Sequence, residues 1–326
     1  MADPSSPTFV VRLTPEDSAR YFAADVAAGL SSRPRWIPPK WLYDPLGCAL
    51  FETITTLEEY YPTRTERAIL EAHADDIAKL SGATTLIELG SGTSEKTLLL
   101  LDALSAAGSL ERFVGFDVAE QTLRDALDSL AARYPAMVLA GVVGDFDRHL
   151  DALPAVAGRM VVLLGGTLGN LDPVRRAALL ADVARVLNPG EHLLLGTDLV
   201  KDPARLVAAY DDRDGVTERF ERNILTVVNA TLGATFDPAG FDYVARWSPE
   251  ASRIEMALRA RWAQHVEITD LDMVVDLEAG EEIQTEVSTK FRVDGLAAEL
   301  AAAGLGVVDT WTDSDEDFAL TLAERN

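Results

Sequence analysis

Short apolar segments alternate with amphipathic segments through the middle of this chain, and this pattern constrains its fold more than any other feature. We predict buried strands over Thr84–Leu89, Arg112–Val118, Met137–Val143, Met160–Leu164 and His192–Gly196. Helices are expected between them, and Asp172 and Pro173 mark the start of the last one, Pro173–Leu187. Such alternation predicts a doubly wound, mostly parallel sheet, which is a Rossmann-like α/β fold.

The pattern changes after Leu199. Helices are predicted over Pro203–Tyr210 and Gly215–Ala230, and Phe241–Val275 then reads as alternating, antiparallel strands. A helix at Val293–Ala303 and two further strands would complete the first sheet. We therefore expect a ligand-binding α/β domain from residues 65–198 and 291–326, and a second, α+β domain for the substrate from residues 12–64 and 199–290.

The composition limits the partners of the protein. The chain carries 53 acidic and 29 basic residues, a formal net charge of -24, so nucleic acid and anionic membranes would be repelled. The single cysteine, Cys48, suits a reducing compartment, and the first residues lack the pattern of a signal peptide. We expect a soluble, cytoplasmic monomer that acts on a small molecule.

A glycine turn follows the first predicted strand, in the sequence ELGSGTSEKT. It lacks the second glycine before the lysine that a P-loop requires. Gly90 and Gly92 match the first half of a dinucleotide fingerprint, but Glu95 occupies the third glycine position, where it would crowd and repel a pyrophosphate. The turn is therefore predicted to bind a ligand without phosphate.

S-adenosylmethionine (SAM) fits the residues that follow the strands. Glu88 and the turn come after the first strand, and Asp117 at the end of the second can bind two ribose hydroxyls. Asp145 and Phe146 follow the third strand, where they can accept from the adenine amino group and pack on the base. Each element is weak alone, because a glycine turn or a helix cap explains it, but the ordered set is specific for SAM.

The sequence resembles the histidine Nα-methyltransferases of ergothioneine biosynthesis over roughly Ala19 to Leu322. The matching motifs are PPKWLYD, EYYPTRTE, ELGSGTSEKT, GTLGNL, GTDLVKD, AYDD, RIEM and EVSTKFR. The resemblance implies a class I methyltransferase fold and SAM-dependent trimethylation of the α-amino group of L-histidine to hercynine.

The resemblance also implies roles for individual residues. Tyr43 matches a catalytic tyrosine beside the reacting amine. The substrate-binding positions are Tyr60, Gly165, Asn170, Tyr210, Met256, Glu286 and Ser288, of which Asn170 and Tyr210 match groups on the α-carboxylate and Glu286 and Ser288 match the pair on the imidazole. The SAM-binding positions are Gly90, Lys96, Asp117, Asp145 and Phe146.

The pattern of residues leaves some of these positions open. Gln284, Glu286 and Ser288 alternate, so on a strand they would share one face, which could be a solvated face. Asn170 could cap the next helix, and Met256 could be a core residue. Two other functions also stay open: a methyltransferase for another amino acid or amine, with an indole or phenol side chain, and a non-catalytic SAM sensor.

No metal site is predicted. The four histidines (His73, His149, His192, His265) lack ligand spacing. The acidic run Asp313–Phe318 lacks the complete spacing of a calcium loop, so we interpret it as a solvated turn.

Overall fold

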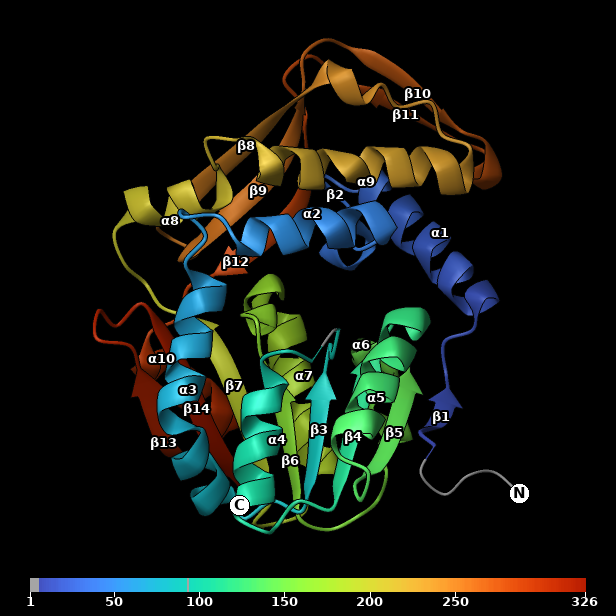
Figure 1. Cartoon of the computed structure of the whole chain (residues 1–326). Coiled ribbons are helices and arrows are strands. Elements are labelled where there is room, and N and C mark those ends of the chain that lie inside the picture. Colours follow the sequence, from blue (N-terminus) through green and yellow to red (C-terminus); the bar gives the residue numbers. More distant parts are fainter. Residues whose placement is uncertain (1–5, 93) are drawn as a thin grey trace. The chain divides into compact units, whose positions relative to one another are not determined.

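The computed structural model describes residues 6–92 and 94–326. The chain forms two compact units (Figure 1). The first contains residues 1–14, 64–199 and 291–326, and the second contains residues 15–63 and 200–290. These bounds resemble those of the two expected domains; the assignment of SAM to one and substrate to the other stays a prediction. Within the described residues, no helix is long and apolar enough to span a membrane.

An eight-stranded sheet organises the first unit, in the order β1-β5-β4-β3-β6-β7-β14-β13. The strands are β1 (Thr8–Val11), β3 (Thr85–Leu89), β4 (Arg112–Asp117), β5 (Val138–Val143), β6 (Arg159–Leu163), β7 (His192–Asp198), β13 (Leu305–Thr312) and β14 (Phe318–Arg325). Neighbours from β1 to β7 pair in parallel, whereas β14 is antiparallel to both β7 and β13. The predicted doubly wound, Rossmann-like fold is confirmed.

Helices cover both faces of this sheet because its central strands are buried and apolar on both sides. The helices are α3 (Pro62–Ser81), α4 (Thr97–Ala106), α5 (Glu120–Arg133), α6 (Phe146–His149), α7 (Pro173–Val186) and α10 (Val293–Ala302), with 3-10 turns η2 (Leu150–Ala152) and η3 (Thr167–Asn170). α3, α4 and α5 pack on one face of the sheet, and α7 and α10 pack on the other (Figure 1). Each face has one apolar core. The loops that follow the parallel strands therefore form the carboxyl edge of the sheet.

The second unit is a mixed α+β unit. Its four-stranded sheet has the order β2-β12-β9-β8, and a separate hairpin pairs β10 with β11. The strands are β2 (Arg35–Trp36), β8 (Phe241–Ser248), β9 (Arg253–Ala260), β10 (Gln264–Ile268), β11 (Met273–Leu277) and β12 (Glu282–Thr289). Strands predicted within Phe241–Val275 are therefore confirmed as antiparallel and separate from the large sheet.

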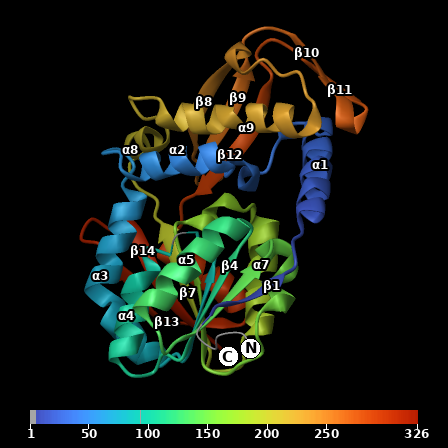
Figure 2. The ribbon, with the colours of Figure 1, turned by 45° about the vertical axis from the view of Figure 1, so that its right-hand side comes forward.

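Helices pack against this smaller sheet. They are α1 (Pro15–Ser31), α2 (Pro45–Thr55), α8 (Pro203–Tyr210) and α9 (Val216–Leu232), with 3-10 turns η1 (Pro39–Leu42), η4 (Pro238–Gly240) and η5 (Thr269–Leu271). α2 and α9 lie side by side (Figure 2). Phe220, Ile224 and Val228 recur along α9 at helical spacing and join Ile254, Met256 and Leu258 of β9 in one core.

Three details differ from the sequence predictions. β1 was not predicted, and it adds a parallel edge strand beside β5. β2 was not predicted either, and it pairs in parallel with β12. The predicted common face of Gln284, Glu286 and Ser288 is wrong for Gln284, because a β-bulge at Thr285 shifts the register of β12 against β9.

Candidate functional site

The glycine turn leaves β3 at the carboxyl edge of the large sheet. Gly90 and Gly92 have φ of +70° and +48°, the left-handed region that favours glycine. An added Cβ at either position would meet no described atom within 4 Å, so a ligand has room to approach the backbone here. The structure thus brings the turn to open space, as a SAM site requires; Thr93 of this turn lies outside the described residues.

Asp117 lies beside this turn at the end of β4. Its Oδ2 accepts from the Gly92 amide at 2.8 Å and its Oδ1 accepts from the Ala119 amide at 2.8 Å. Burial raises the pKa of Asp117, and the backbone hydrogen bonds oppose that shift. Each oxygen keeps a second lone pair, so the held carboxylate can accept from two vicinal hydroxyl groups.

Asp145 and Phe146 begin α6 after β5. Asp145 is buried, and its Oδ1 accepts from the Asp147 amide at 3.0 Å, which caps the helix. Phe146 packs partly buried against the apolar core of this face. Asp145 therefore caps α6. To accept from the adenine amino group as well, its carboxylate would have to use a lone pair other than the one that caps the helix.

Glu88 is held by hydroxyl groups of its own loop. It is 5% exposed and accepts from Ser91 at 3.0 Å, from Ser94 at 2.9 Å and from Thr97. Burial raises the pKa of Glu88 from 4.5 to about 7, against the opposing effect of these hydrogen bonds. Glu88 therefore organises the turn that carries Gly90 and Gly92.

Glu66 of α3 is a site residue that the sequence analysis missed. It is fully buried, forms an ion pair with Lys96 and accepts from the Gly165 amide at 2.9 and 3.0 Å. A Cβ on Gly196 would lie 1.9 Å from Glu66 Oε1, so any side chain there would displace this carboxylate. Two predicted site positions, Lys96 and Gly165, are thus joined through one buried carboxylate. The motif EYYPTRTE contained Glu66, but an acid in the first turns of a helix normally faces solvent.

The loop after β6 carries Gly165 and Asn170. Gly165 and Gly166 have φ of +76° and +69°, and Asn170 ends η3. Asp172 caps α7 by accepting from the amides of Val174 at 2.9 Å and Arg175 at 3.0 Å, as the sequence predicted. The cap of α7 is therefore filled by Asp172, which removes the main alternative role considered for Asn170.

Aromatic rings gather around Tyr43 and Tyr60 in the second unit. The Tyr43 ring meets Phe51 and Phe220 edge-on, each at 5.5 Å between centroids, and Tyr60 meets Tyr210 at 5.8 Å. Burial, and next the charge of Glu286, raise the pKa of Tyr43 well above 10. Tyr43 remains 39% exposed, so desolvation acts on it less than on a fully covered group, but both effects have the same sign. Tyr43 is therefore a neutral hydroxyl at pH 7.

Tyr210, Ser288 and Lys290 form a buried polar triangle. Lys290 Nζ lies 2.8 Å from Tyr210 Oη and 2.7 Å from Ser288 Oγ, and the two hydroxyls are 2.8 Å apart. Tyr210 is brought there by the end of α8, and Ser288 and Lys290 by β12 and the residue after it. Lys290 was not predicted as a site residue, since a lysine in a strand-rich segment is usually exposed.

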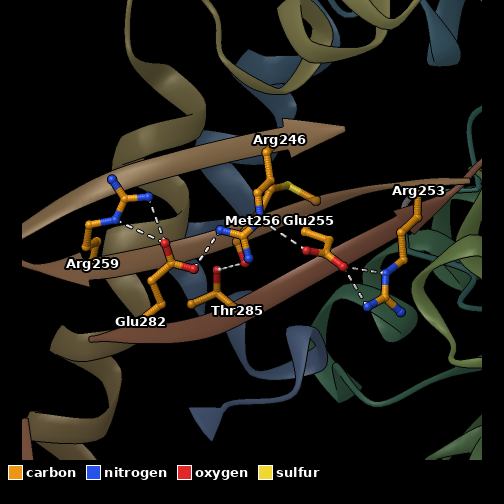
Figure 3. A network of polar contacts seen from close by, with 7 residues as sticks. All are labelled: Arg246, Arg253, Glu255, Met256, Arg259, Glu282 and Thr285. Atoms are coloured by element: carbon orange, nitrogen blue, oxygen red, sulfur yellow. Dashed lines mark hydrogen bonds and ion pairs between the residues drawn. The ribbon is translucent and has the colours of Figure 1, made fainter. Parts of the chain in front are cut away.

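Glu286 and Ser288 share one face of β12 with Met256 of β9. Glu286 pairs with Met256, and Ser288 pairs with Ile254, whose side chain is also buried. Thr285, the extra residue of the bulge, donates from Oγ1 to the Met256 carbonyl at 3.3 Å (Figure 3). The opposite face carries ion pairs of Glu255 and Glu282 with arginines (Figure 3). Because of the bulge, Glu286 lies on the same face as Met256 and not on the solvated, charged face.

Glu221 of α9 lies next to Glu286 and is a second residue that the sequence analysis missed. Its carboxyl group faces Thr285 and Glu286, yet neither oxygen makes a hydrogen bond of good geometry within residues 6–92 and 94–326. Burial, and next the charge of Glu286, raise the pKa of Glu221 well above 4.5. A fully buried acid without such bonds is expected to be protonated at neutral pH.

Asp313, Asp315 and Asp317 form a cluster of acids at the turn before β14. Their oxygens lie within 4.8 Å of one another, the only such cluster in the part of the chain that the structure describes. Asp313 itself accepts from the amides of Asp317 at 2.8 Å and Phe318 at 2.9 Å, as the acid of a tight turn does. The predicted turn is confirmed, but it is solvated only in part, because Asp317 is 2% exposed and Phe318 already begins β14. The prediction of no metal stays a prediction.

The chain is similar to known methyltransferases over almost its whole length. A family profile described as histidine-specific methyltransferase, SAM-dependent, matches residues 22–325. The chain is 53% identical over 313 residues to the histidine N-alpha-methyltransferase of Mycolicibacterium smegmatis, covering 96% of this chain and 98% of that protein. It is 52% identical over 301 residues to the protein of the same name from Mycobacterium tuberculosis, covering 92% and 94%. It is 31% identical to ergothioneine biosynthesis protein 1 of Neurospora crassa, covering 90% of this chain and 33% of that protein.

Proposed function

Because the chain belongs to the SAM-dependent, histidine-specific methyltransferase family, we propose that it trimethylates the α-amino group of L-histidine to give hercynine. This reaction is the first step of ergothioneine biosynthesis. The observation that carries the proposal for this chain is the pair Glu286 and Ser288, which share the face of Met256. A carboxylate and a hydroxyl on one buried face match the two ring nitrogens of an imidazole.

The residues around the glycine turn fit SAM. Gly90 and Gly92 leave space for a ligand at the backbone, and Asp117 is held with acceptor sites to spare for the ribose hydroxyls. Asp145 and Phe146 are assigned to the adenine, and Lys96 to the SAM site through its ion pair with Glu66. SAM supplies a methyl group on a sulfonium, which is already activated for transfer to an amine.

The remaining residues are assigned to histidine. Glu286 and Ser288 bind the imidazole, and Met256 and Tyr60 line its pocket. Asn170 and Tyr210 bind the α-carboxylate. Gly165 is assigned to the surroundings of the amine, where its positive φ presents backbone that a side chain would disturb. A substrate bound at both ends has its amine fixed, and positioning of this kind is the main source of rate in a displacement by an activated donor.

Tyr43 is assigned to orienting the amine. The amine must be neutral, with its lone pair toward the methyl carbon, when the new N–C bond forms and the S–C bond breaks. Because its pKa is raised, Tyr43 acts through a neutral hydroxyl and not as a phenolate base. Aromatic faces near Tyr43, including Phe51 and Phe220, suit an amine that becomes cationic as methyl groups are added. The third transfer gives a quaternary nitrogen, so no fourth is possible.

The experiment that tests this function is methyl transfer across a panel of amines. Purified protein is incubated with SAM and with L-histidine, L-tryptophan, L-tyrosine or histamine, and products are identified by mass spectrometry. We expect trimethylated histidine as the main product, and loss of it in Asp117→Ala, which removes the acceptors assigned to the ribose. Preferred methylation of another amine would refute the assignment to histidine. Binding of SAM without turnover of any amine would instead indicate a sensor.

A further inference from the structure

Asn223 is a polar residue on the buried side of α9. It is 6% exposed, and its neighbours Phe220, Ile224 and Leu225 are each 2% exposed or less. Removing an amide from water costs free energy unless the amide makes hydrogen bonds in the protein. Asn223 makes such a bond with Asp44, a residue 179 positions earlier in the chain: its Nδ2 donates to Asp44 Oδ1 at 2.7 Å. A carboxylate oxygen accepts, so the amide nitrogen must be the donor.

Asp44 directly follows Tyr43 and holds the turn between η1 and α2. Its Oδ1 also accepts from the Gly47 amide at 2.8 Å, which caps α2, and its carbonyl oxygen accepts from the Cys48 amide at 2.8 Å. The turn is tight, because a Cβ on Gly47 would lie 1.7 Å from the carbonyl oxygen of Leu42. A single oxygen of Asp44 therefore joins the turn that carries Tyr43 to α9.

α9 contacts the same turn at a second point. The ring of Phe220 meets the ring of Tyr43 edge-on, at 5.5 Å between centroids. Residues three apart on a helix lie on one face, so Phe220 reaches the ring of Tyr43 while Asn223 holds the residue that follows it. A ring contact alone lets the two segments slide past each other, whereas a hydrogen bond is directional and fixes both distance and orientation.

We propose that Asn223 is a positioning residue, which acts through Asp44 to hold the Tyr43 hydroxyl in the orientation that methyl transfer requires. This inference rests on the proposed function, in which Tyr43 orients the amine of the substrate. It goes further by giving the reaction a residue of α9 that acts without touching the substrate. Because positioning sets the rate of the displacement, loss of the hydrogen bond lowers kcat more than it raises KM.

The test compares two asparagines of the same helix. Asn223→Ala removes the bond to Asp44, and Asn229→Ala removes a pair of bonds to the backbone of Phe236, at 2.8 and 2.9 Å. Steady-state kinetics are measured with L-histidine and SAM. We expect Asn223→Ala to lower kcat about tenfold or more with both KM values within about threefold of wild type, and Asn229→Ala to keep the wild-type kcat. A wild-type kcat in Asn223→Ala, or an equal loss in both variants, would overturn the inference.

A double-mutant cycle shows whether Asn223 acts through Tyr43. Tyr43→Phe lacks the hydroxyl that Asn223 is proposed to hold, so adding Asn223→Ala to it should change kcat by less than about threefold. Losses that multiply would contradict the inference, because a purely structural asparagine affects both backgrounds alike.

Asp44→Ser breaks the same hydrogen bond from the other side. Serine keeps an oxygen that can cap α2, but its side chain is one bond shorter and withdraws the acceptor from Asn223. Asp44→Ser should therefore lower kcat as Asn223→Ala does, and it provides the test if Asn223→Ala does not fold. A wild-type kcat in Asp44→Ser would also count against the role of Asn223.

The outcomes separate this inference from the proposed function. A protein that trimethylates histidine and is slowed by Tyr43→Phe but not by Asn223→Ala overturns only the role of Asn223. A wild-type kcat in Tyr43→Phe overturns the roles of Tyr43 and Asn223 together. A wild-type protein that does not methylate histidine overturns the proposed function itself.

Discussion

Glu88 is predicted to make the stability of the protein depend on pH. Its carboxyl group is 5% exposed, and burial raises its pKa from 4.5 to about 7. Hydrogen bonds from Ser91, Ser94 and Thr97 favour the ionised form but do not offset the loss of water around the carboxylate. The folded protein therefore holds this proton at pH values where the unfolded chain has released it.

The sign and size of the effect follow from this difference. Between pH 4.5 and about 7 the folded state binds more protons at this site than the unfolded state. The stabilisation is therefore complete below pH 4.5 and is lost as the pH rises through about 7. A difference of about 2.5 pKa units corresponds to about 3 kcal/mol, of which about 2 to 3 kcal/mol is lost between about pH 5 and pH 8.

The variant Glu88→Gln removes the titrating group and keeps its shape. Free energies of unfolding in urea are measured at several pH values from about 5 to 8 for wild type and variant. We expect the variant to gain about 2 to 3 kcal/mol relative to wild type over this range. This comparison cancels any constant cost of fitting an amide among the three hydroxyls.

Glu111→Gln serves as a control, since Glu111 is an exposed acid next to β4. It should show the same pH dependence as wild type. A difference between wild type and Glu88→Gln that stays constant with pH would refute the reasoning, because it would mean that Glu88 is ionised in the folded protein throughout.

The other predictions concern the substrate site and the buried carboxylates. Glu286→Ala should raise the KM for histidine about tenfold or more in steady-state kinetics, because an imidazole N–H loses its acceptor; an unchanged KM would remove Glu286 from recognition. Tyr43→Phe should lower kcat more than it weakens SAM binding measured by calorimetry, and a wild-type kcat would contradict its orienting role. Glu221→Gln should bind histidine within about fivefold of wild type at pH 7, because the buried acid is already neutral; a much larger loss would show that its negative charge is needed. Gly196→Ala, whose Cβ would lie 1.9 Å from Glu66 Oε1, should destabilise the protein by about 1 to 3 kcal/mol, and an unchanged melting temperature would refute the close approach.

The sequence by itself determined the alternation of strands and helices in the large sheet. Apolar runs such as Thr85–Leu89, and the pair Asp172 and Pro173 at the start of α7, act over a few residues and are therefore visible in the chain. Gly90, Asp117 and Asp145 follow successive predicted strands. Because parallel strands place their carboxyl ends together, this order predicted that the three residues lie at the same edge of the sheet. The structure does bring Gly92 and Asp117 into contact there.

Only the tertiary structure decided how distant segments meet. β1 is too short to show a clear strand pattern in the sequence, and it is stabilised by hydrogen bonds to β5, over a hundred residues away. The bulge at Thr285 depends on the register with β9, so strict alternation misplaced Gln284. Glu66, Glu221 and Lys290 look like ordinary charged residues in the sequence, and each is buried only because another segment covers it. Burial of a charge is a property of the packed chain, and neighbouring residues carry no signal of it.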